Sequence, residues 1–98
     1  MDKPKPTPGG VATSKAGRDA GRKFAILSVE GDWLALADGD LRKVEKPKRK
    51  KCMHVRVTPH ILPEIVLLLD NGTPVENHHL RKALKALEER LTEVKTDA

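Results

Sequence analysis

The stretch SKAGRDAGRKFAILSV, residues 14–29, carries the strongest fold signal in this sequence. Gly17 and Gly21 lie close together among cations, and such a pair is typical of a loop because glycine opens backbone conformations that other residues adopt only at a cost. An apolar segment follows directly. The stretch therefore predicts a charged loop that leads into a buried strand over residues 22–29.

Both faces of that predicted strand carry apolar side chains, because successive side chains point to opposite faces. The first face holds Ala25, Leu27 and Val29, and the second holds Phe24, Ile26 and finally Ser28. The inside of a small barrel can cover only one face. We therefore expect a helix to lie over Phe24 and Ile26.

Four further segments have the length and turn signals of short strands. They are residues 9–14, 33–37, 41–44 and 54–58, with turns at Glu30-Gly31-Asp32 and Asp38-Gly39. Five short strands within about fifty residues are typical of a small barrel. The sequence thus predicts a mainly β fold, a small five-stranded barrel.

The C-terminal third predicts helices that pack on this barrel. A four-three-four-three spacing places five apolar residues on one helical stripe: Leu80, Leu84, Leu87, Leu91 and Val94. We expect this helix to run from an N-cap at Asn77 to about Val94, with Thr73 to Glu76 as an alternative capping box. Upstream, the β-branched content of residues 61–70 suits a strand, whereas Pro63-Glu64 resembles a helix start and Asn71-Gly72 a helix end. The spacing of Ile61, Ile65 and Leu69 favours the short helix.

Charge is concentrated in one segment. The 98-residue chain holds 19 Lys and Arg against 14 Asp and Glu, and residues 42–51 alone hold seven cations and one acid. This basic run indicates a polyanionic partner, nucleic acid before an anionic membrane, although a solvated loop would have the same composition.

Other features bound the compartment and the domain organisation. Cys52 is the single cysteine, which suits a reducing cytoplasm, and no segment approaches the roughly 20 apolar residues of a membrane span. The first ten residues lack the apolar core of a secretory signal. We expect a flexible Pro/Lys tail over residues 1–8, a barrel over 9–60 and a helical extension over 61–98.

Residues 14–29 also resemble a KOW motif, the glycine-centred strand-loop-strand of ribosomal proteins and transcription elongation factors. The segment ADGDLRKVEKPKRKKCMHVRVT, residues 37–58, strengthens the likeness to bacterial KOW-domain RNA-binding proteins related to the large-subunit ribosomal proteins of the fourteen-e and twenty-seven-e type. LRKAL, residues 80–84, matches less specifically. The resemblance implies an SH3-like barrel that binds structured, ribosomal RNA in a translation setting.

The same resemblance assigns the site residues. The RNA-binding cations would be Lys15, Arg18, Arg22, Lys23, Lys43, Lys46, Lys48, Arg49, Lys50 and Lys51. Gly17, Asp19 and Gly21 would shape the loop. The expected protein is a monomer that needs no cofactor.

Several alternatives remain open at this point. Phe24 and Trp33 are the only aromatic residues, and packing of Trp33 at the barrel rim is favoured over base stacking. Cys52 and the four histidines (His54, His60, His78 and His79) match no zinc-finger spacing, so we expect no metal. No nucleophile, base and orienting group occur together, so we expect no enzyme. The rival functions are a protein-interaction module and a transcription-associated or DNA-binding factor.

Overall fold

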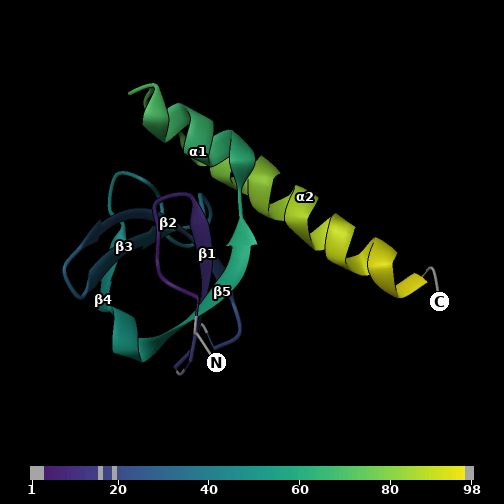
Figure 1. The fold of residues 1–98 in the computed structure, drawn as a ribbon, viewed down its shortest axis with the longest axis horizontal. Coiled ribbons are helices and arrows are strands. Elements are labelled where there is room, and N and C mark those ends of the chain that lie inside the picture. The colour runs from purple at the N-terminus through teal and green to yellow at the C-terminus, as the bar shows by residue number, and fades with distance from the viewer. Residues whose placement is uncertain (1–3, 16, 19, 97–98) are drawn as a thin grey trace.

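The computed structural model describes residues 4–15, 17–18 and 20–96 and shows an antiparallel sheet followed by two helices (Figure 1). The elements are β1 (Gly10–Ser14), β2 (Lys23–Glu30), β3 (Trp33–Ala37), β4 (Lys48–Lys51), a 3₁₀ turn η1 (Cys52–His54), β5 (Val55–Ile61), α1 (Pro63–Asp70) and α2 (Asn77–Thr96). The strand order is β4-β3-β2-β1-β5. The prediction of a mainly β, five-stranded fold followed by a C-terminal α-helix or helical hairpin is confirmed for the sheet and for the C-terminal helical segment, but the sheet is not closed into a barrel.

One predicted strand is wrong. Residues 41–44 lie in a loop, and the fourth strand is the Lys48–Lys51 segment of the basic run. The loop satisfies its backbone through side chains: Arg42 N donates to Asp38 Oδ1 at 2.8 Å, and Val44 N donates to Asn77 Oδ1 at 2.8 Å. The N–H groups of Arg42 and Val44 are therefore satisfied without hydrogen bonds to a neighbouring strand.

A β-bulge in β2 changes which of its residues share a face. Ile26 pairs with Leu36, but the next pair is Ser28 with Ala35, so Leu27 is an extra residue on β2. Such a bulge reverses the alternation beyond it. Val29 therefore packs on the same face as Ile26, and Ser28 is exposed on the other.

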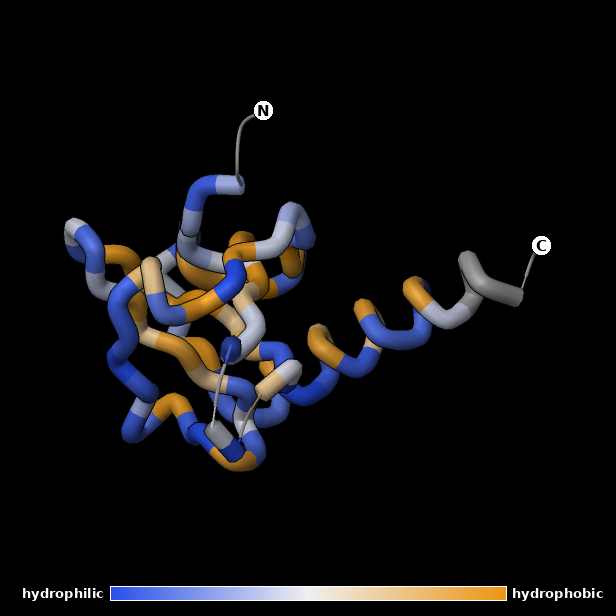
Figure 2. The backbone as a smooth tube through the Cα atoms, turned by 90° about the horizontal axis from the view of Figure 1, so that it is seen from below, coloured by the Kyte–Doolittle hydropathy of each residue, from blue (hydrophilic) through white to orange (hydrophobic). Residues whose placement is uncertain are grey.

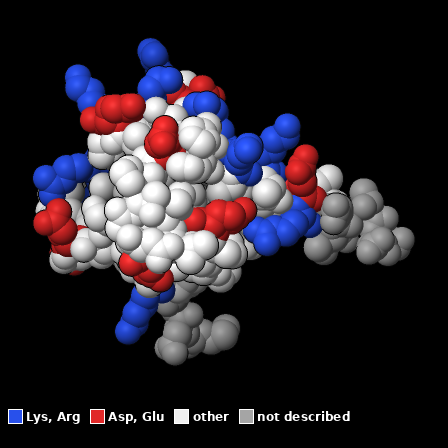
Figure 3. All heavy atoms as spheres, turned by 90° about the horizontal axis from the view of Figure 1, so that it is seen from above, with Lys and Arg blue, Asp and Glu red and all other residues white. Residues whose placement is uncertain are grey.

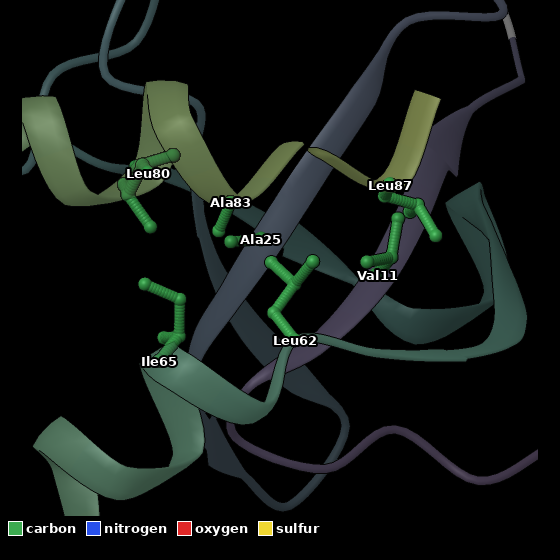
Figure 4. Packing of buried hydrophobic residues seen from close by; sticks show 8 residues of the cluster. Val11, Ala25, Leu62, Ile65, Leu80, Ala83 and Leu87 are labelled. Atoms are coloured by element: carbon green, nitrogen blue, oxygen red, sulfur yellow. The ribbon is translucent and has the colours of Figure 1, made fainter. Parts of the chain in front are cut away.

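The sheet carries a hydrophobic cluster on each face. The concave cluster comprises Ala12, Phe24, Ile26, Leu34, Leu36 and Val55, from four strands including the edge strand β5. The convex cluster joins Val11, Ala25 and Ala37 of the sheet to Leu62, Ile65, Leu80, Ala83 and Leu87 (Figure 4). The prediction that β2 needs cover on both faces is confirmed.

The predicted partner of the helices is wrong, because they cover Ala25 rather than Phe24 and Ile26. Ala25 and Ala37 have small side chains, so the helices can approach the sheet closely there. The larger Phe24 and Ile26 fill the concave side of the curled sheet, where both are fully buried.

The start of α2 differs in one detail from the prediction. The Glu76 carbonyl accepts the bond from His79 N at 3.0 Å, and the Glu76 N–H donates to His79 Nδ1 at 2.9 Å. Glu76 is therefore the N-cap, half of a capping box with His79, and Asn77 is the first helical residue. The Asn77 side chain is directed to residues 44–45 instead.

The far end of α2 projects beyond the sheet and carries apolar residues on successive turns (Figure 2). Leu87 is buried, and Leu84 and Leu91 are partly buried against the convex cluster. The predicted stripe is thus confirmed through Leu91. The side chain of Val94, its last predicted member, lies outside the described residues.

Candidate nucleic-acid interface

The convex face of the sheet is bare where β3 and β4 pair beyond the helices. Trp33, Ala35 and Ala37 share this face, but only Ala37 belongs to the helix-covered cluster. Two rows of cross-strand neighbours remain outside that cluster. We call them the Trp33 patch: Glu30, Trp33 and Lys51 in one row, and Ser28, Ala35 and Arg49 in the next.

Cations surround the indole of the patch. Trp33 is 42% exposed, and its ring centroid lies 5.5 Å from Arg49 Cζ and 5.6 Å from Lys51 Nζ. Both distances are within the range of a cation–π interaction. Trp33 is thus partly exposed, and the side chains nearest to its ring include two cations of the basic run.

The other two cations of β4 point the opposite way. The register places Lys50 opposite Leu34 and Lys48 opposite Leu36, on the concave face, and both lysines are half-buried. Inward-pointing charges on an edge strand discourage pairing with a further strand. The alternation of side chains along β4 therefore places two of its four predicted RNA contacts, Arg49 and Lys51, on the outward face. The other two, Lys48 and Lys50, lie on the inward face.

The loop between β3 and β4 presents two more predicted cations. Lys43 and Lys46 are exposed. Asn77 Nδ2 donates to Glu45 Oε1 at 3.0 Å, and this bond, with smaller contributions from its own backbone and from Lys43, lowers the pKa of Glu45. The first residue of α2 thereby holds the loop and favours the ionised form of Glu45.

The glycine loop has the backbone that its sequence predicts. Gly17 and Gly21 both have φ of +83°, where a side chain would be strained. Lys15 and Arg18 are exposed, and Lys15 Nζ donates to Met53 O at 3.2 Å, so the loop lies beside η1, directly after β4. Asp19, the remaining predicted loop residue, lies outside the described residues.

Arg22 and Lys23 bind carboxylates of the protein itself. Arg22 Nε donates to Asp38 Oδ2 at 2.6 Å and its Nη2 to Asp40 Oδ2 at 3.1 Å, while Lys23 pairs with Glu88 of α2. Both cations therefore form ion pairs within the protein and do not join the cations of β4 on one surface.

Asp38 is the centre of the hydrogen-bond network around Arg22. The sequence predicts only a turn at Asp38-Gly39 and does not indicate this network. The Asp38 carboxylate is 4% exposed and accepts bonds from the N–H groups of Asp40 and Arg42 as well as from Arg22. Burial alone would raise the pKa of Asp38, but these three donors outweigh it and lower the pKa. The hydrogen bond that Arg22 donates to Asp38 in turn raises the pKa of Arg22.

Sequence reasoning also missed Arg81, whose Nη1 donates to the Gly39 carbonyl at 2.7 Å. Together with Lys23 and Glu88 it lines a shallow groove between α2 and the 38–40 turn. Seen from above, both signs of charge surround an uncharged central surface (Figure 3). This groove and this face are therefore mixed in charge, unlike the outward side of β4.

In comparisons with known proteins, no protein-family model matches the chain and no curated protein matches it. Within the described residues, no three His, Cys, Asp or Glu side chains gather as a metal site. Neither described helix is long and apolar enough to cross a membrane.

Proposed function

We propose that this protein is a non-enzymatic RNA-binding domain whose contact surface is the outward side of β4 and the loops beside it. The observation that carries the proposal is the Trp33 patch, where Arg49 and Lys51 project beside an exposed indole on a part of the sheet that the helices leave bare. A positive patch with one aromatic residue suits a phosphate-rich ligand.

The charges near the patch support this reading. No carboxylate of the described residues lies within ion-pair distance of Arg49 or Lys51, in contrast to Arg22 and Lys23. Lys43 and Lys46 add exposed positive charge in the preceding loop, and Lys15 and Arg18 add it beside η1. These six cations form the proposed RNA surface, while Arg22 and Lys23 hold the fold together.

The resemblance to KOW-domain proteins supports the same function and a finer fold. We propose that the curled sheet, with the η1 turn between β4 and β5, is an SH3-like barrel with an open seam. By the same resemblance, the RNA would be structured and ribosomal, and the setting would be translation in the cytoplasm.

A protein-interaction module that adds a strand to the β4 edge of the sheet fits less well. Strand addition needs an edge that accepts a neighbouring strand, and Lys48 and Lys50 place charge at that position on β4. The pattern favours a ligand on the outward face over a peptide on the edge.

The salt dependence of binding tests the proposal. Each phosphate contact changes the slope of log affinity against log salt by about 0.7 to 0.9. The double variant Arg49→Ala/Lys51→Ala should therefore flatten the slope by roughly 1.4 to 1.8. The matched control, Lys48→Ala/Lys50→Ala, removes the same charge from the inward side and should flatten it much less.

The titrations use a structured RNA and a DNA duplex of equal length, with circular dichroism to show that both variants are folded. Equal slope changes in the two variants would show that total charge, and not the Trp33 patch, drives binding. Equal affinity of the wild type for RNA and DNA would favour the DNA-binding reading. Absence of binding to any nucleic acid at low salt would refute the proposed function.

A further inference from the structure

The Trp33 patch also indicates how the ligand is held. Lys51 lies directly opposite Trp33 in the β3–β4 ladder, and Arg49 lies on the diagonal, opposite Ala35. Direct and diagonal neighbours on one face of an antiparallel pair are close enough for long side chains to touch. Both cations therefore meet the same indole, at 5.5 Å and 5.6 Å from its centroid.

We infer that Trp33 is a positioning residue that holds Arg49 and Lys51 as a two-cation clamp for RNA phosphates, so that the ligand is the backbone of double-helical RNA rather than unpaired bases. This inference rests on the proposed function and names the ligand class of the same site.

The surroundings of the indole favour the clamp over a stacking platform. A base that stacked where the cations lie would have to displace them from the ring. Ala35 carries only a methyl group beside Arg49, and Ser28 adds an exposed hydroxyl donor to the same row. Glu30, exposed on the far side of Trp33, repels phosphate from that end and leaves the β4 side as the favourable one.

The rest of the aromatic inventory leads to the same conclusion. Proteins that bind single strands stack successive bases on several aromatic side chains. This chain has one Trp, one Phe and no Tyr, and Phe24 is fully buried. A single indole engaged by cations cannot follow a run of unpaired bases. Duplex RNA is instead recognised by its phosphates and its shape.

The test measures binding of the full chain to a blunt RNA duplex and to an unstructured single-stranded RNA with the same number of phosphates. Four variants are compared with the wild type: Trp33→Leu, Trp33→Phe, Arg49→Ala/Lys51→Ala, and the triple variant with Trp33→Leu. Circular dichroism and thermal melting verify that each is folded.

With a clamp, the wild type prefers the duplex. Arg49→Ala/Lys51→Ala loses roughly 25-fold to 60-fold at 0.1 M salt, the value expected for two phosphate contacts. Trp33→Leu lowers the affinity for the duplex roughly 5-fold to 30-fold, as the loss of two exposed cation–π contacts would give. Trp33→Phe keeps most of the wild-type affinity, because phenylalanine also has an aromatic face. Because the indole acts through the cations, Trp33→Leu has no further effect in the triple variant.

With base stacking, the wild type prefers the single strand and Trp33→Leu weakens that complex roughly 5-fold to 150-fold, with the loss persisting in the triple variant. That result would overturn the clamp and leave RNA binding intact. Failure of the wild type to bind either RNA would instead refute the proposed function itself.

Intrinsic fluorescence gives an independent measurement, because Trp33 is the only tryptophan and the chain has no tyrosine. In the clamp, emission changes when Arg49 and Lys51 are removed from the free protein, and duplex RNA quenches it little. Strong quenching by the single-stranded RNA, unchanged in Arg49→Ala/Lys51→Ala, would show stacking and contradict the clamp.

Discussion

Replacing Gly39 by alanine should be far more damaging than the same change at Gly31, although both glycines have positive φ, +77° and +59°. A Cβ at Gly39 would lie 2.3 Å from the Asn77 carbonyl oxygen and 3.0 Å from its carbonyl carbon. A Cβ at Gly31 would meet nothing within 4 Å. Comparing Gly39→Ala with Gly31→Ala therefore separates the loss of stability caused by backbone conformation from the loss caused by steric contact.

The expected magnitudes follow from these contacts. An alanine with positive φ costs about 1 to 2 kcal/mol, which is the whole effect expected at Gly31. At Gly39 the atom in the way is backbone at the start of α2, so the turn and the helix must separate. That movement breaks the 2.7 Å bond from Arg81 to the Gly39 carbonyl, and a bond to a charged group contributes about 1.5 to 3 kcal/mol.

Gly39→Ala should thus lower the free energy of unfolding by about 2.5 to 5 kcal/mol, against about 1 to 2 for Gly31→Ala. In a domain of this size each kcal/mol shifts the melting temperature by about 4 to 8 °C. Urea titration followed by circular dichroism, with thermal melts in parallel, measures both variants. Equal losses would refute the close approach of the 38–40 turn to α2.

Other predictions concern the helical layer and the buried carboxylate. Leu80→Ala removes a fully buried side chain and should cost about 2 to 5 kcal/mol in urea titration, whereas Leu67→Ala, at a position 60% exposed, should cost less than about 0.5. Deleting residues 74–98 should lower the melting temperature and increase dye binding to exposed apolar surface; an unchanged melt would contradict the packing of α2 on the sheet. Because the folded-state pKa of Asp38 lies below its ordinary value of 3.8, its contribution to stability is present above pH 3.8 and is lost as the pH falls through the folded-state pKa. Asp38→Asn should therefore weaken the acid dependence of unfolding, and an unchanged pH profile would show that the bond from Arg22 does not depend on that charge.

The elements with strong local patterns could be predicted from the sequence. The stripe from Leu80 to Leu91 gave α2, Pro63 with Asn71-Gly72 gave α1, and the paired glycines gave the first loop, because each signal is complete within one segment. Two-sided burial of β2 was also visible, since apolar side chains at consecutive positions need cover on both faces.

The fourth strand could not be predicted, because it forms only by pairing with β3 and has no strand pattern of its own. Lys48–Lys51 has no apolar alternation and pairs as a strand only along Trp33–Ala37. The register between β3 and β4 decides which two cations of β4 face outward. The sequence therefore indicates a basic surface but not that Arg49 and Lys51 lie on one face and Lys48 and Lys50 on the other. Asn77 was recognised as a helix-start residue, but its bonds to residues 44–45 require the tertiary fold.

The bulge at Leu27 connects the core to the proposed site. With regular pairing, Ser28 would lie opposite Leu34 on the concave face and Val29 opposite Trp33 on the convex face. A hydroxyl would then enter the apolar core, where burial without a partner is costly, and an apolar side chain would stand next to the indole. The extra residue turns Val29 into the concave cluster and brings Ser28 into the row with Ala35 and Arg49. One inserted residue thus completes the core and keeps the proposed RNA surface polar, because both depend on the same register between β2 and β3.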